Sequence, residues 1–413
     1  MDVAADLHVH SHWSRATSRS CTLEGLGRWA RLKGVRLVGT GDCTHPLWLA
    51  EIAEKLEPSA PGLFRLKEAA RAAVEEVPPR CRGPVEFVLS GEISSIYKRD
   101  GQVRKVHCLV LLPGLEEARR FSEKLDAVGN IRSDGRPILG LDPRDLFAML
   151  LEISPEAVLI PAHIWTPWFS TLGSKSGFDS VEAAFGDLTN HIPAVETGLS
   201  SDPPMNYRVS ELDRFTLVAS SDLHSPANLA RNATLFRCEV TYPAIRQALF
   251  EPTADTFGGT IDLFPEAGKY HLDGHRRCGV CLEPEESLAR DNRCPECGKP
   301  LVLGVLHRVT ELADRPRGFV PEGAMPYRHL VPLPHLLSEL YGVGPRTKTV
   351  SRSYHRLLRA VGPELHILRD ADPERLENQD PPGLAEAVRR VRVEAVTREP
   401  GCDGEYGRIR VFG

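Results

Sequence analysis

Short segments rich in histidine and carboxylate residues constrain what this chain can fold into. They are Asp6-Leu7-His8-Val9-His10, residues 41–45 (Gly-Asp-Cys-Thr-His), Gly91-Glu92, His107, Pro161-Ala162-His163 and Ser221-Asp222-Leu223-His224. Each follows a β-branched or aliphatic run that is typical of a β-strand. Because the strands of a barrel deliver side chains from their carboxyl ends to one face, we expect these groups to converge. Such a cluster can hold divalent metal ions.

The N-terminal part alternates apolar runs with helical patterns. Strands are predicted over residues 36–41, 85–91, 106–112, 157–162, 194–196 and 216–221, and amphipathic helices over 23–33, 63–77 and 116–128. This alternation predicts a parallel barrel or sheet, and the repeated histidines and acids at strand ends favour the barrel. Two long loops, 164–178 and 197–207, are expected to carry substrate contacts.

At 413 residues the chain is too long for one ordinary core. Its pattern changes at Glu251-Pro252 and Gly258-Gly259. We predict a catalytic barrel over residues 1–251, a linker and zinc-binding module over 252–308, and a mainly helical region over 309–413. The formal charge of −5 does not itself predict nucleic-acid binding, but bound metal ions would add positive charge.

Neither a membrane span nor a secretion signal stands out. Of the ten cysteines, four cluster and six are scattered, which is typical of a reducing compartment rather than of a disulfide framework. We therefore expect a cytoplasmic protein with no membrane partner. Nothing in the sequence predicts an obligate oligomer, so a monomer is expected.

Two pairs of metal-type residues repeat the same spacing. His8 and His10 lie at i and i+2 of a predicted strand, so both side chains point to one face and can bind one ion. Asp222 and His224 repeat this spacing at another strand end. One such pair alone is weak evidence, because two polar residues at a strand end look the same. It is the repetition that favours a metal centre.

Four cysteines in two pairs predict a structural zinc site. Cys278-x2-Cys281 and Cys294-x2-Cys297 supply paired thiolates on two separate turns, which suits a closed tetrahedral site. A redox-active Cys-x-x-Cys would need only one pair. His275 is a weaker alternative ligand. Such modules contact nucleic acid in some proteins and only stabilise small domains in others, so the role of this one stays open.

The histidine and carboxylate segments together resemble the PHP (polymerase and histidinol phosphatase) metallohydrolase family. The resemblance implies an α/β fold with a distorted (β/α)7 barrel and two or three divalent ions: zinc, manganese or magnesium. It implies that His8, His10, Glu92 and Asp222 hold one ion, that Glu92 shares a second with His107 and His163, and that His224 holds a third with Asp42 or His45. The family commonly has adjacent Asp and His where this chain has Asp42-Cys43-Thr44-His45.

Closely spaced ions would deprotonate a water and grip the oxygens of a phosphoester. Zinc or manganese suits the mixture of histidine and carboxylate better than magnesium does. Asp222 is a candidate catalytic residue as well as a ligand. Glu196 and Asp202 follow a predicted strand, and each is a candidate ligand or base, with a solvated loop acid as the equally expected alternative.

More specific segments resemble the endonuclease Q family along essentially the whole chain. They are residues 13–18 (Trp-Ser-Arg-Ala-Thr-Ser), 41–46, 259–278, 308–315 and 400–412. This resemblance implies a metal-dependent DNA repair endonuclease that cuts on the 5′ side of deaminated bases (uracil, hypoxanthine, xanthine) and abasic sites. The implied partner is damaged double- or single-stranded DNA. A sliding clamp is a further candidate partner, although no convincing clamp-binding peptide is present.

An enzyme that inspects a base must take it out of the stack, and aromatic side chains beside His163 could stack on it. Ordinary packing is the alternative for each ring. Farther along, Gly342-x-Gly344 before a basic helix offers amides and positive charge to a phosphate, with a solvated helix face as the alternative. The candidate DNA- or base-binding residues are Trp165, Trp168, Phe169, Ser170, Lys175, Arg346, Lys348 and Arg352.

Two other functions compete with a nuclease. A PHP phosphatase acting on a small phosphomonoester would explain the metal site, but it would need neither the zinc module nor the basic helical region. A non-catalytic DNA-binding module with a decayed site fits poorly with the nearly complete set of ligands.

Overall fold

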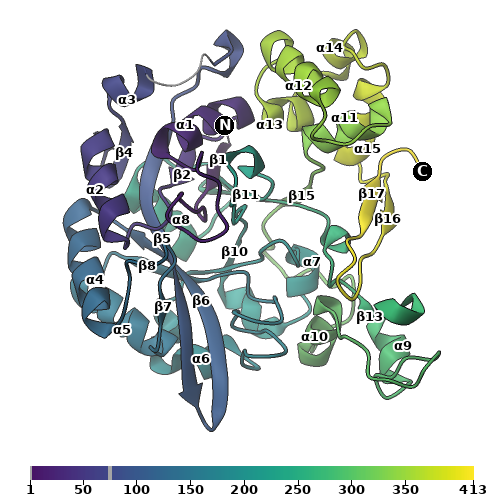
Figure 1. Ribbon diagram of the computed structural model, residues 1–413, viewed down its shortest axis with the longest axis horizontal. Coiled ribbons are helices and arrows are strands. Elements are labelled where there is room, and N and C mark those ends of the chain that lie inside the picture. The colour runs from purple at the N-terminus through teal and green to yellow at the C-terminus, as the bar shows by residue number, and fades with distance from the viewer. Residues whose placement is uncertain (1, 73–76) are drawn as a thin grey trace.

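A ring of seven strands forms the N-terminal part of the computed structural model, which describes residues 2–72 and 77–413 (Figure 1). The ring consists of β1 (Val3–Asp6), β2 (Leu37–Gly39), β5 (Glu86–Arg99), β6 (Gln102–Leu112), β8 (Val158–Pro161), β9 (Ala194–Glu196) and β10 (Thr216–Val218). β1, β2 and β5 pair in parallel, β6 pairs antiparallel with both β5 and β8, and β9 pairs in parallel with β10. The predicted α/β barrel is confirmed, and the antiparallel β6 is what distorts it.

Two links just beyond the strand ends close this ring. The backbone N–H of Ile164 donates to the carbonyl of Glu196 at 3.0 Å, which joins the ends of β8 and β9. Val9 and Leu223 form a parallel bridge, which joins the ends of β10 and β1. Both links lie beside predicted metal ligands, so the closure of the barrel brings the first and last ligand segments together.

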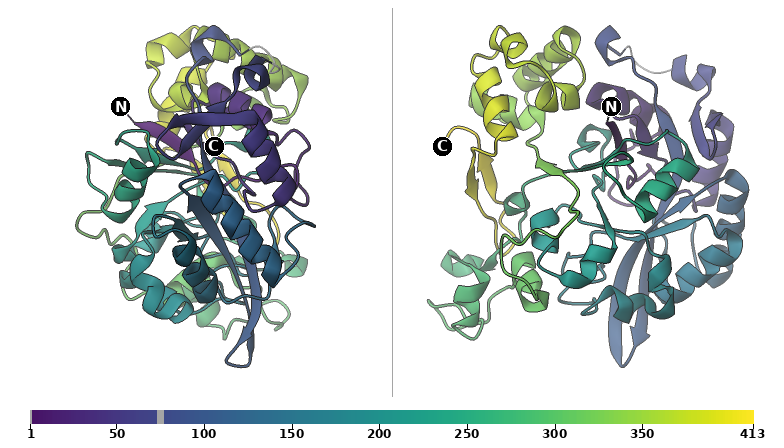
Figure 2. Two further views of the ribbon diagram at one scale, coloured as in Figure 1. Left: turned by 90° about the vertical axis from the view of Figure 1, so that its left-hand side faces the viewer. Right: turned by 180° about the vertical axis from the view of Figure 1, so that it is seen from behind.

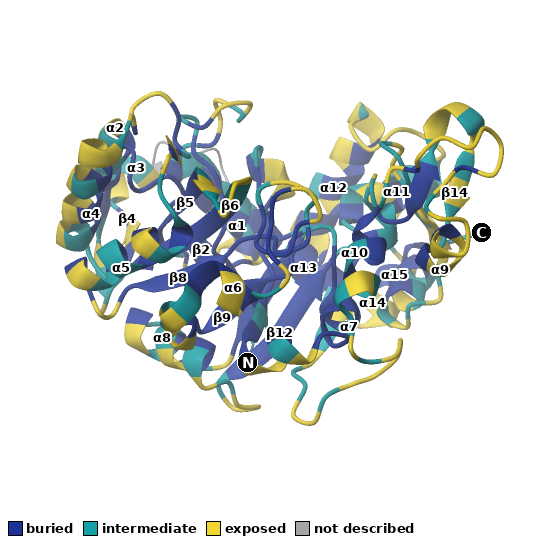
Figure 3. Cartoon of the chain, turned by 90° about the horizontal axis from the view of Figure 1, so that it is seen from below, coloured by how far each residue is buried: buried dark blue, intermediate teal, exposed yellow. Residues whose placement is uncertain are grey.

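Helices cover the outside of the ring because each has one apolar face. α1 (Leu23–Lys33) matches its predicted range; Thr22 caps its start by accepting from the Gly25 N–H, and Gly34, at φ 84°, ends it. α4 (Leu115–Val128) and α5 (Pro143–Ile153) follow β6 and precede β8. Figure 3 shows buried strands inside this unit and exposed residues on the outer faces of α4, α5 and α8 (Tyr242–Phe250).

The predicted helix over residues 63–77 is wrong at its start. β4 (Leu63–Leu66) pairs antiparallel with β3 (Leu56–Ala60), and only Glu68–Ala72 is helical, as α3. The predicted continuation over 73–76 lies outside the described residues. Pairing of Phe64 with Phe87 of β5 draws this segment into the sheet, a tertiary contact that overrides the helical pattern. α2 (Pro46–Lys55) precedes it.

The sheet continues beyond the barrel into the middle of the chain. β11 (Ala233–Phe236) pairs with β1, β12 (Phe257–Asp262) pairs with β11, and β15 (Tyr327–His329) pairs with β12. β12 lies after the predicted boundary at residue 251 and still belongs to the barrel's sheet. The first part of the predicted linker, β12, is therefore an extension of that sheet.

The C-terminal parts form two further bodies beside the barrel (Figures 1 and 2). The cysteine-rich module contains β13 (Asp273–His275), β14 (Val280–Leu282), α9 (Pro284–Leu288) and α10 (Val305–Leu312), and the helical body contains α11 (Leu333–Tyr341), α12 (Lys348–Ala360), α13 (Glu364–Arg369), α14 (Pro373–Glu377) and α15 (Leu384–Arg392). A last antiparallel pair, β16 (Thr397–Glu399) and β17 (Arg408–Arg410), connects them. Among the described residues, no helix is long and apolar enough to cross a membrane.

A buried ion pair fixes the helical body against the barrel. Lys33 Nζ at the end of α1 lies 2.6 Å from Glu364 Oε2 in α13, and both side chains are almost fully buried. The Tyr354 hydroxyl donates to the same carboxylate at 2.8 Å, so the pair also receives a neutral hydrogen bond. Separating the two partners would leave a buried charge without a counter-ion, which costs free energy. The pair therefore stabilises the observed arrangement of the helical body against the barrel.

Candidate metal centre

Four side chains from separate strand ends form the first ligand group. His8, His10, Glu92 and Asp222 each offer one ligand atom, and these atoms lie within 4.8 Å of one another. His10 Nε2 lies 3.1 Å from Asp222 Oδ1 and 3.3 Å from Glu92 Oε2, and His8 Nε2 lies 3.5 Å from that same Glu92 oxygen. The structure thus brings together the residues predicted for the first ion.

The second group uses the other oxygen of Glu92. His107 Nδ1 lies 2.6 Å from Glu92 Oε1, and His163 Nε2 lies 3.1 Å from it. Glu92 therefore faces one group with each carboxylate oxygen, as a carboxylate shared between two ions must. Long β5 supplies Glu92 and β6 supplies His107, and their pairing along the whole hairpin, closed by Asp100 and Gly101 at positive φ, fixes both positions.

The charge states of the two carboxylates suit cation binding. Burial alone would raise the pKa of Glu92, but the neighbouring His107, His8 and Arg136 hold it well below its ordinary value. Burial likewise opposes ionisation of Asp222, and the neighbouring His10 and His8 keep the pKa of that carboxyl low. Both carboxylates are therefore ionised at neutral pH, as a metal ligand must be.

Two further carboxylates orient the histidine rings. Glu196 Oε1 and Oε2 lie 3.1 and 3.0 Å from His8 Nδ1, and Asp42 Oδ1 lies 3.1 Å from His10 Nδ1. Each ring is thereby held by Nδ1 with Nε2 directed at the centre, which is the usual arrangement behind a metal-bound histidine. Glu196, predicted as a ligand or base, is thus placed as an orienting residue.

The donor set fits a divalent ion. Among the described residues, His8 Nε2 is buried without a hydrogen-bond partner, although Glu92 Oε2 and Asp222 Oδ1 lie at 3.5 and 3.7 Å. A buried nitrogen left in this way costs free energy unless a ligand occupies the space between these atoms. The mixture of imidazole and carboxylate suits zinc or manganese.

The third predicted ligand set does not assemble. The other oxygen of Asp42, Oδ2, accepts from the Ser11 N–H at 2.8 Å and from the Ser11 and Ser14 hydroxyls at 2.6 and 2.9 Å. His45 caps α2 with Nδ1 and donates from Nε2 to the carbonyl of Arg132 at 3.1 Å. These contacts contradict the prediction that either residue joins His224. The His224 ring stays partly exposed, 4.6 Å from the ring of His10.

Asp202 is placed outside the ligand groups, contrary to its prediction as a catalytic residue. Its Oδ1 accepts from the Met205 N–H and caps α7 (Pro203–Asn206), while Oδ2 lies 3.0 Å from His329 Nε2. Both oxygens therefore serve the fold: one starts a helix and the other ties the barrel to β15.

Strained backbone places several of these residues. Asp42, His163 and Asp222 adopt positive φ angles of 46°, 30° and 45°. Such conformations cost a non-glycine residue roughly 1–3 kcal/mol and concentrate at functional sites.

A pocket of about 370 Å³ opens beside the ligand groups. His107, His163 and Asp222 contribute to its lining. Two exposed apolar side chains, Trp168 and Ile138, also line it, with 48% and 52% of their surface accessible. A site that combines metal ligands with exposed apolar walls can receive a phosphoester next to a flat ring.

The predicted base-binding residues divide into two sets. Trp165 is buried and donates to Asn206 Oδ1 at 2.8 Å, and the buried Ser170 hydroxyl donates to the Thr166 carbonyl, so neither is free for a base. These two predictions are wrong. Trp168 lines the pocket, and Phe169 also does, with its ring 4.8 Å from that of His107. Exposed residues outside the pocket lining are Lys175, Arg346, Lys348 and Arg352.

Arg136 is a pocket residue that the sequence did not indicate. Its Nη1 lies 3.1 Å from Glu92 Oε2, within the first ligand group. No helical or strand pattern marks the surrounding segment, and the approach of Arg136 depends on the way residues 130–137 fold over Asp42. The sequence signal closest to Arg136 is the preceding pair Asp134-Gly135, which is typical of a turn.

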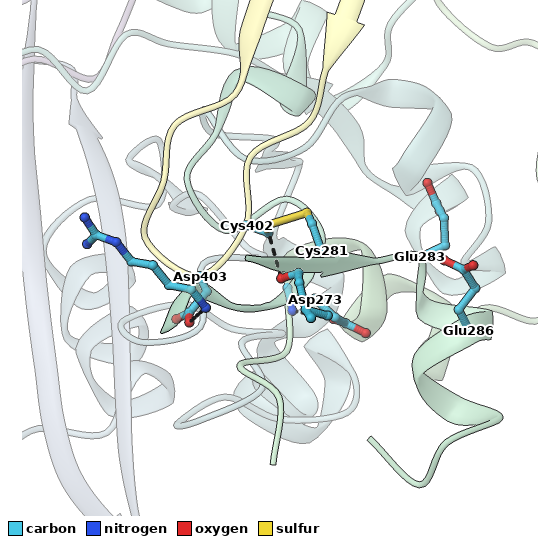
Figure 4. The surroundings of a disulfide bond; sticks show 9 residues. Asp273, Cys281, Glu283, Glu286, Cys402 and Asp403 are labelled. Carbon is cyan, nitrogen blue, oxygen red and sulfur yellow. Dashed lines mark hydrogen bonds between the residues drawn. A yellow bond between two sulfur atoms is a disulfide. The ribbon is translucent and has the colours of Figure 1, made fainter. Parts of the chain in front are cut away.

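The cysteine-rich module assembles a different set from the four predicted cysteines. His275, Cys278, Cys294 and Cys297 form a group that could hold a metal ion. Cys281 is instead disulfide-bonded to Cys402, as Figure 4 shows. Cys281, the remaining predicted ligand, lies outside this group, and His275-x2-Cys278 stands where Cys278-x2-Cys281 was predicted as the first ligand pair.

Strand alternation explains this exchange. Cys281 in β14 pairs with Gly274 in β13, and His275 pairs with Val280. Paired residues share a face of a sheet and successive residues alternate, so Cys281 and His275 lie on opposite faces. Gly274 leaves room for Cys402, whose side chain a Cβ at this position would crowd. Only the face of His275 meets the other three cysteines.

Two solved structures resemble this protein along almost its whole length. The crystal structure of the lesion-specific endonuclease PfuEndoQ from Pyrococcus furiosus is 32% identical, with a TM-score of 0.86, covering 99% of this chain and 95% of that one. An endonuclease Q complex with a 27-mer duplex substrate, with an abasic lesion at the active site, is also 32% identical, with a TM-score of 0.83, covering 99% of this chain and 96% of that one.

Two sequence matches extend this result. The uncharacterized protein YqxK of Bacillus subtilis is 28% identical over 99% of both chains. Residues 332–395 match the MJ0043 C-terminal domain family, which covers α11 to α15. Because the identity, fold and coverage agree from end to end, the chain belongs to the endonuclease Q family.

Proposed function

We propose that this protein is a DNA repair endonuclease that hydrolyses the phosphodiester bond on the 5′ side of deaminated bases (uracil, hypoxanthine and xanthine) and of abasic sites. The observation that carries the proposal is the match over 99% of the chain to an endonuclease Q bound to a duplex with an abasic lesion at its active site. The paired ligand groups beside an open pocket support it, because phosphodiester hydrolysis is a common use of such a centre.

Two divalent ions at these groups would supply a nucleophile at neutral pH and positive charge for the phosphate. His8, His10 and Asp222 would hold one ion, and His107 and His163 the other. Glu92 would take part in holding both, because it belongs to both groups. Glu196 and Asp42 would keep the rings of His8 and His10 in the orientation that binding requires.

The pocket of about 370 Å³ is the proposed place for the lesion. A nucleotide that leaves the helix needs a flat surface to replace its stacking partners. Trp168 is about half exposed at the edge of the pocket and is the proposed stacking platform. Phe169 lies deeper, against His107, and Lys105 Nζ lies 5.2 Å from the centre of the Phe169 ring. Lys175, exposed in the same loop, is a proposed phosphate contact.

The helical body is the proposed second contact with DNA. α11 ends at Gly342 in a left-handed conformation, and Thr347 caps α12 by accepting from the Val350 N–H. The connection and the first turns of α12 expose Arg346, Lys348 and Arg352, whereas the neighbouring Arg356 pairs with Asp380. Exposed cations of this kind contact phosphates irrespective of sequence.

A nicking assay with a panel of duplexes tests the proposal. End-labelled duplexes carry one uracil, hypoxanthine, xanthine or abasic site, and an undamaged duplex and an Asp222→Asn protein are the controls. We expect metal-dependent cutting of the lesion duplexes alone and none with the variant. Hydrolysis of p-nitrophenyl phosphate without any cutting would instead identify a phosphatase. A chain shortened at residue 251 is no substitute for the whole protein here, because β12 and β15 belong to the sheet that continues from the barrel.

A further inference from the structure

The cationic side chain of Arg136 lies against the first ligand group, where metal ions alone would be expected to supply positive charge. Arg136 Nη1 is 3.1 Å from Glu92 Oε2, the oxygen that also faces His8 and His10. The Arg136 side chain is 27% exposed, and it lines the pocket together with His163 and Asp222. Its guanidinium group thus contacts the ligand centre while part of it remains open to the pocket.

The backbone that carries Arg136 is fixed on both sides. The N–H of Gly135 donates to the carbonyl of Trp13 at 3.0 Å, and the N–H of Ser94 donates to the carbonyl of Pro137 at 3.0 Å. Gly135 packs directly on the Asp42 carboxylate, so closely that a Cβ there would overlap it. Arg136 is therefore held at the centre by the same strand that supplies Glu92, and its approach does not depend on a loose loop.

A counter-ion for Glu92 would not be needed once metal ions are bound. Divalent ions at the two groups would compensate the charge of Glu92 from both of its oxygens. A nearby guanidinium would then only repel them, because like charges a few ångströms apart in a buried site cost free energy. An anion bound beside the metal ions would compensate the positive charge of Arg136. The guanidinium group and the ions can then lie close together.

We propose that Arg136 is a phosphate-binding residue of this enzyme, holding a non-bridging oxygen of the scissile phosphate beside the two metal groups. The inference rests on the proposed function and adds a residue to its substrate contacts. The planar fork of a guanidinium matches two phosphate oxygens, and its charge offsets the negative charge that grows on them as the bond breaks. A lysine at this position would keep the charge and lose the fork.

A purely structural role of Arg136 predicts different experimental results from a phosphate-binding role. If Arg136 only held Glu92 in place, its loss would weaken metal binding, an excess of metal would restore activity, and Arg136→Lys would behave nearly as the natural protein. If Arg136 binds the phosphate, the ions stay bound, excess metal does not help, and Arg136→Lys remains defective because a single ammonium cannot replace the fork.

The test compares Arg136→Gln and Arg136→Lys with Arg132→Gln. Arg132 lies in the same segment, but its exposed side chain pairs with Asp126 at 2.7 Å and lines no part of the pocket. Single-turnover cutting of an abasic duplex is measured with excess manganese, and bound manganese is counted by elemental analysis. We expect Arg136→Gln to keep its manganese and to cut about 10²- to 10³-fold more slowly, Arg136→Lys to fall between, and Arg132→Gln to be unchanged.

A second readout needs no cutting. Inorganic phosphate is titrated into the manganese-loaded proteins by calorimetry, and we expect Arg136→Gln and Arg136→Lys to bind it about tenfold or more weakly, with Arg132→Gln unchanged. Should the natural protein cut no duplex, the proposed function fails and this titration still decides the role of Arg136. Undiminished phosphate binding in both Arg136 variants, or full recovery of cutting by added metal, would overturn the assignment.

Discussion

Glu196 holds the ring of His8 from behind, with Oε1 3.1 Å and Oε2 3.0 Å from His8 Nδ1. The same carboxylate accepts a hydrogen bond from the backbone N–H of His163 at 2.9 Å. One side chain therefore positions a ligand of each metal group. This makes Glu196 a positioning residue of the centre, although it contacts neither Glu92 nor Asp222 in the described hydrogen bonds.

Glu196→Gln should weaken metal binding without removing a ligand. The amide would keep the size of the side chain and lose the charge that fixes the His8 tautomer, so we expect metal affinity to fall about 10- to 100-fold. A titration of the metal-free protein with manganese, followed by cutting activity, measures this change. Glu152→Gln, on the exposed end of α5, is the matched control. An unchanged manganese affinity would contradict the orienting role of Glu196.

The zinc module should not need Cys281. Because His275, Cys278, Cys294 and Cys297 form the ligand group, we expect Cys281→Ser to retain one zinc ion and His275→Ala or Cys294→Ser to lose it. Zinc per chain is counted after the barrel groups have been loaded with manganese. If Cys281→Ser lost its zinc as completely as Cys294→Ser, the ligand set would be the four cysteines instead.

The link between Cys281 and Cys402 should be visible by mass. Peptide mapping without reductant should recover the two cysteines in one cross-linked peptide, and reduction should separate them. Because the link closes a separation of 121 residues, we expect Cys402→Ser to lower the free energy of unfolding by about 2–4 kcal/mol under oxidising conditions and not in reductant. Equal stability in both conditions would show that the link does not form.

How far the sequence predicts this site depends on the kind of contact. His8 and His10 lie just beyond the end of β1, on either side of Val9, which bridges Leu223, and both residues meet Glu92 as expected. Trp165 and Trp168 both follow His163 closely, yet one is buried against Asn206 and the other exposed. No periodicity distinguishes them, because that loop has no regular structure.

The remaining differences arise from tertiary contacts. Asp42 and His45 lie in one turn, and only the folded chain shows that Asp42 faces His10 while His45 caps α2. Cys281 and Cys402 are far apart in sequence, and the pairing of β13 with β14 decides which cysteine faces the zinc ligands. Local spacing predicted the chemistry of each segment, whereas the division of roles within it required the packing.

Stability should depend on pH through His329. Its Nε2 lies 3.0 Å from Asp202 Oδ2 and its Nδ1 lies 2.8 Å from Glu394 Oε1. Burial alone would lower the pKa of His329, but the two carboxylates raise it to about 10. Because this folded-state pKa lies above that of an unfolded histidine, the stabilisation is complete below about pH 6.5 and is lost as the pH rises through about 10.

We therefore expect His329→Gln to lower the free energy of unfolding by about 3 kcal/mol near about pH 6 and to have a much smaller effect above about pH 10. Urea unfolding at a series of pH values measures both. His191→Gln, on the surface, is the control. A loss of stability in His329→Gln that stays constant across this range would contradict the charged pairing.

Trp168 should contribute to the affinity for lesion DNA, whereas the buried Trp165 should contribute to the stability of the fold. Trp168→Ala removes an exposed ring at the pocket, so we expect affinity for an abasic or uracil duplex to fall about tenfold, with the melting temperature unchanged. Fluorescence anisotropy with an inactive Asp222→Asn background measures the affinity. Tyr406→Ala, which removes a more exposed ring far along the chain, is the control. Equal effects of the two substitutions would argue against a stacking platform at Trp168.

The position of the cut on a duplex with one abasic site tests the central claim most directly. The duplex is labelled at one end, incubated with the protein and manganese, and its products are compared with a ladder of known length. A single nick at the phosphodiester on the 5′ side of the lesion, abolished by a chelator and restored by manganese, is the predicted result. Cutting on the 3′ side, or equal cutting of an undamaged duplex, would contradict the account.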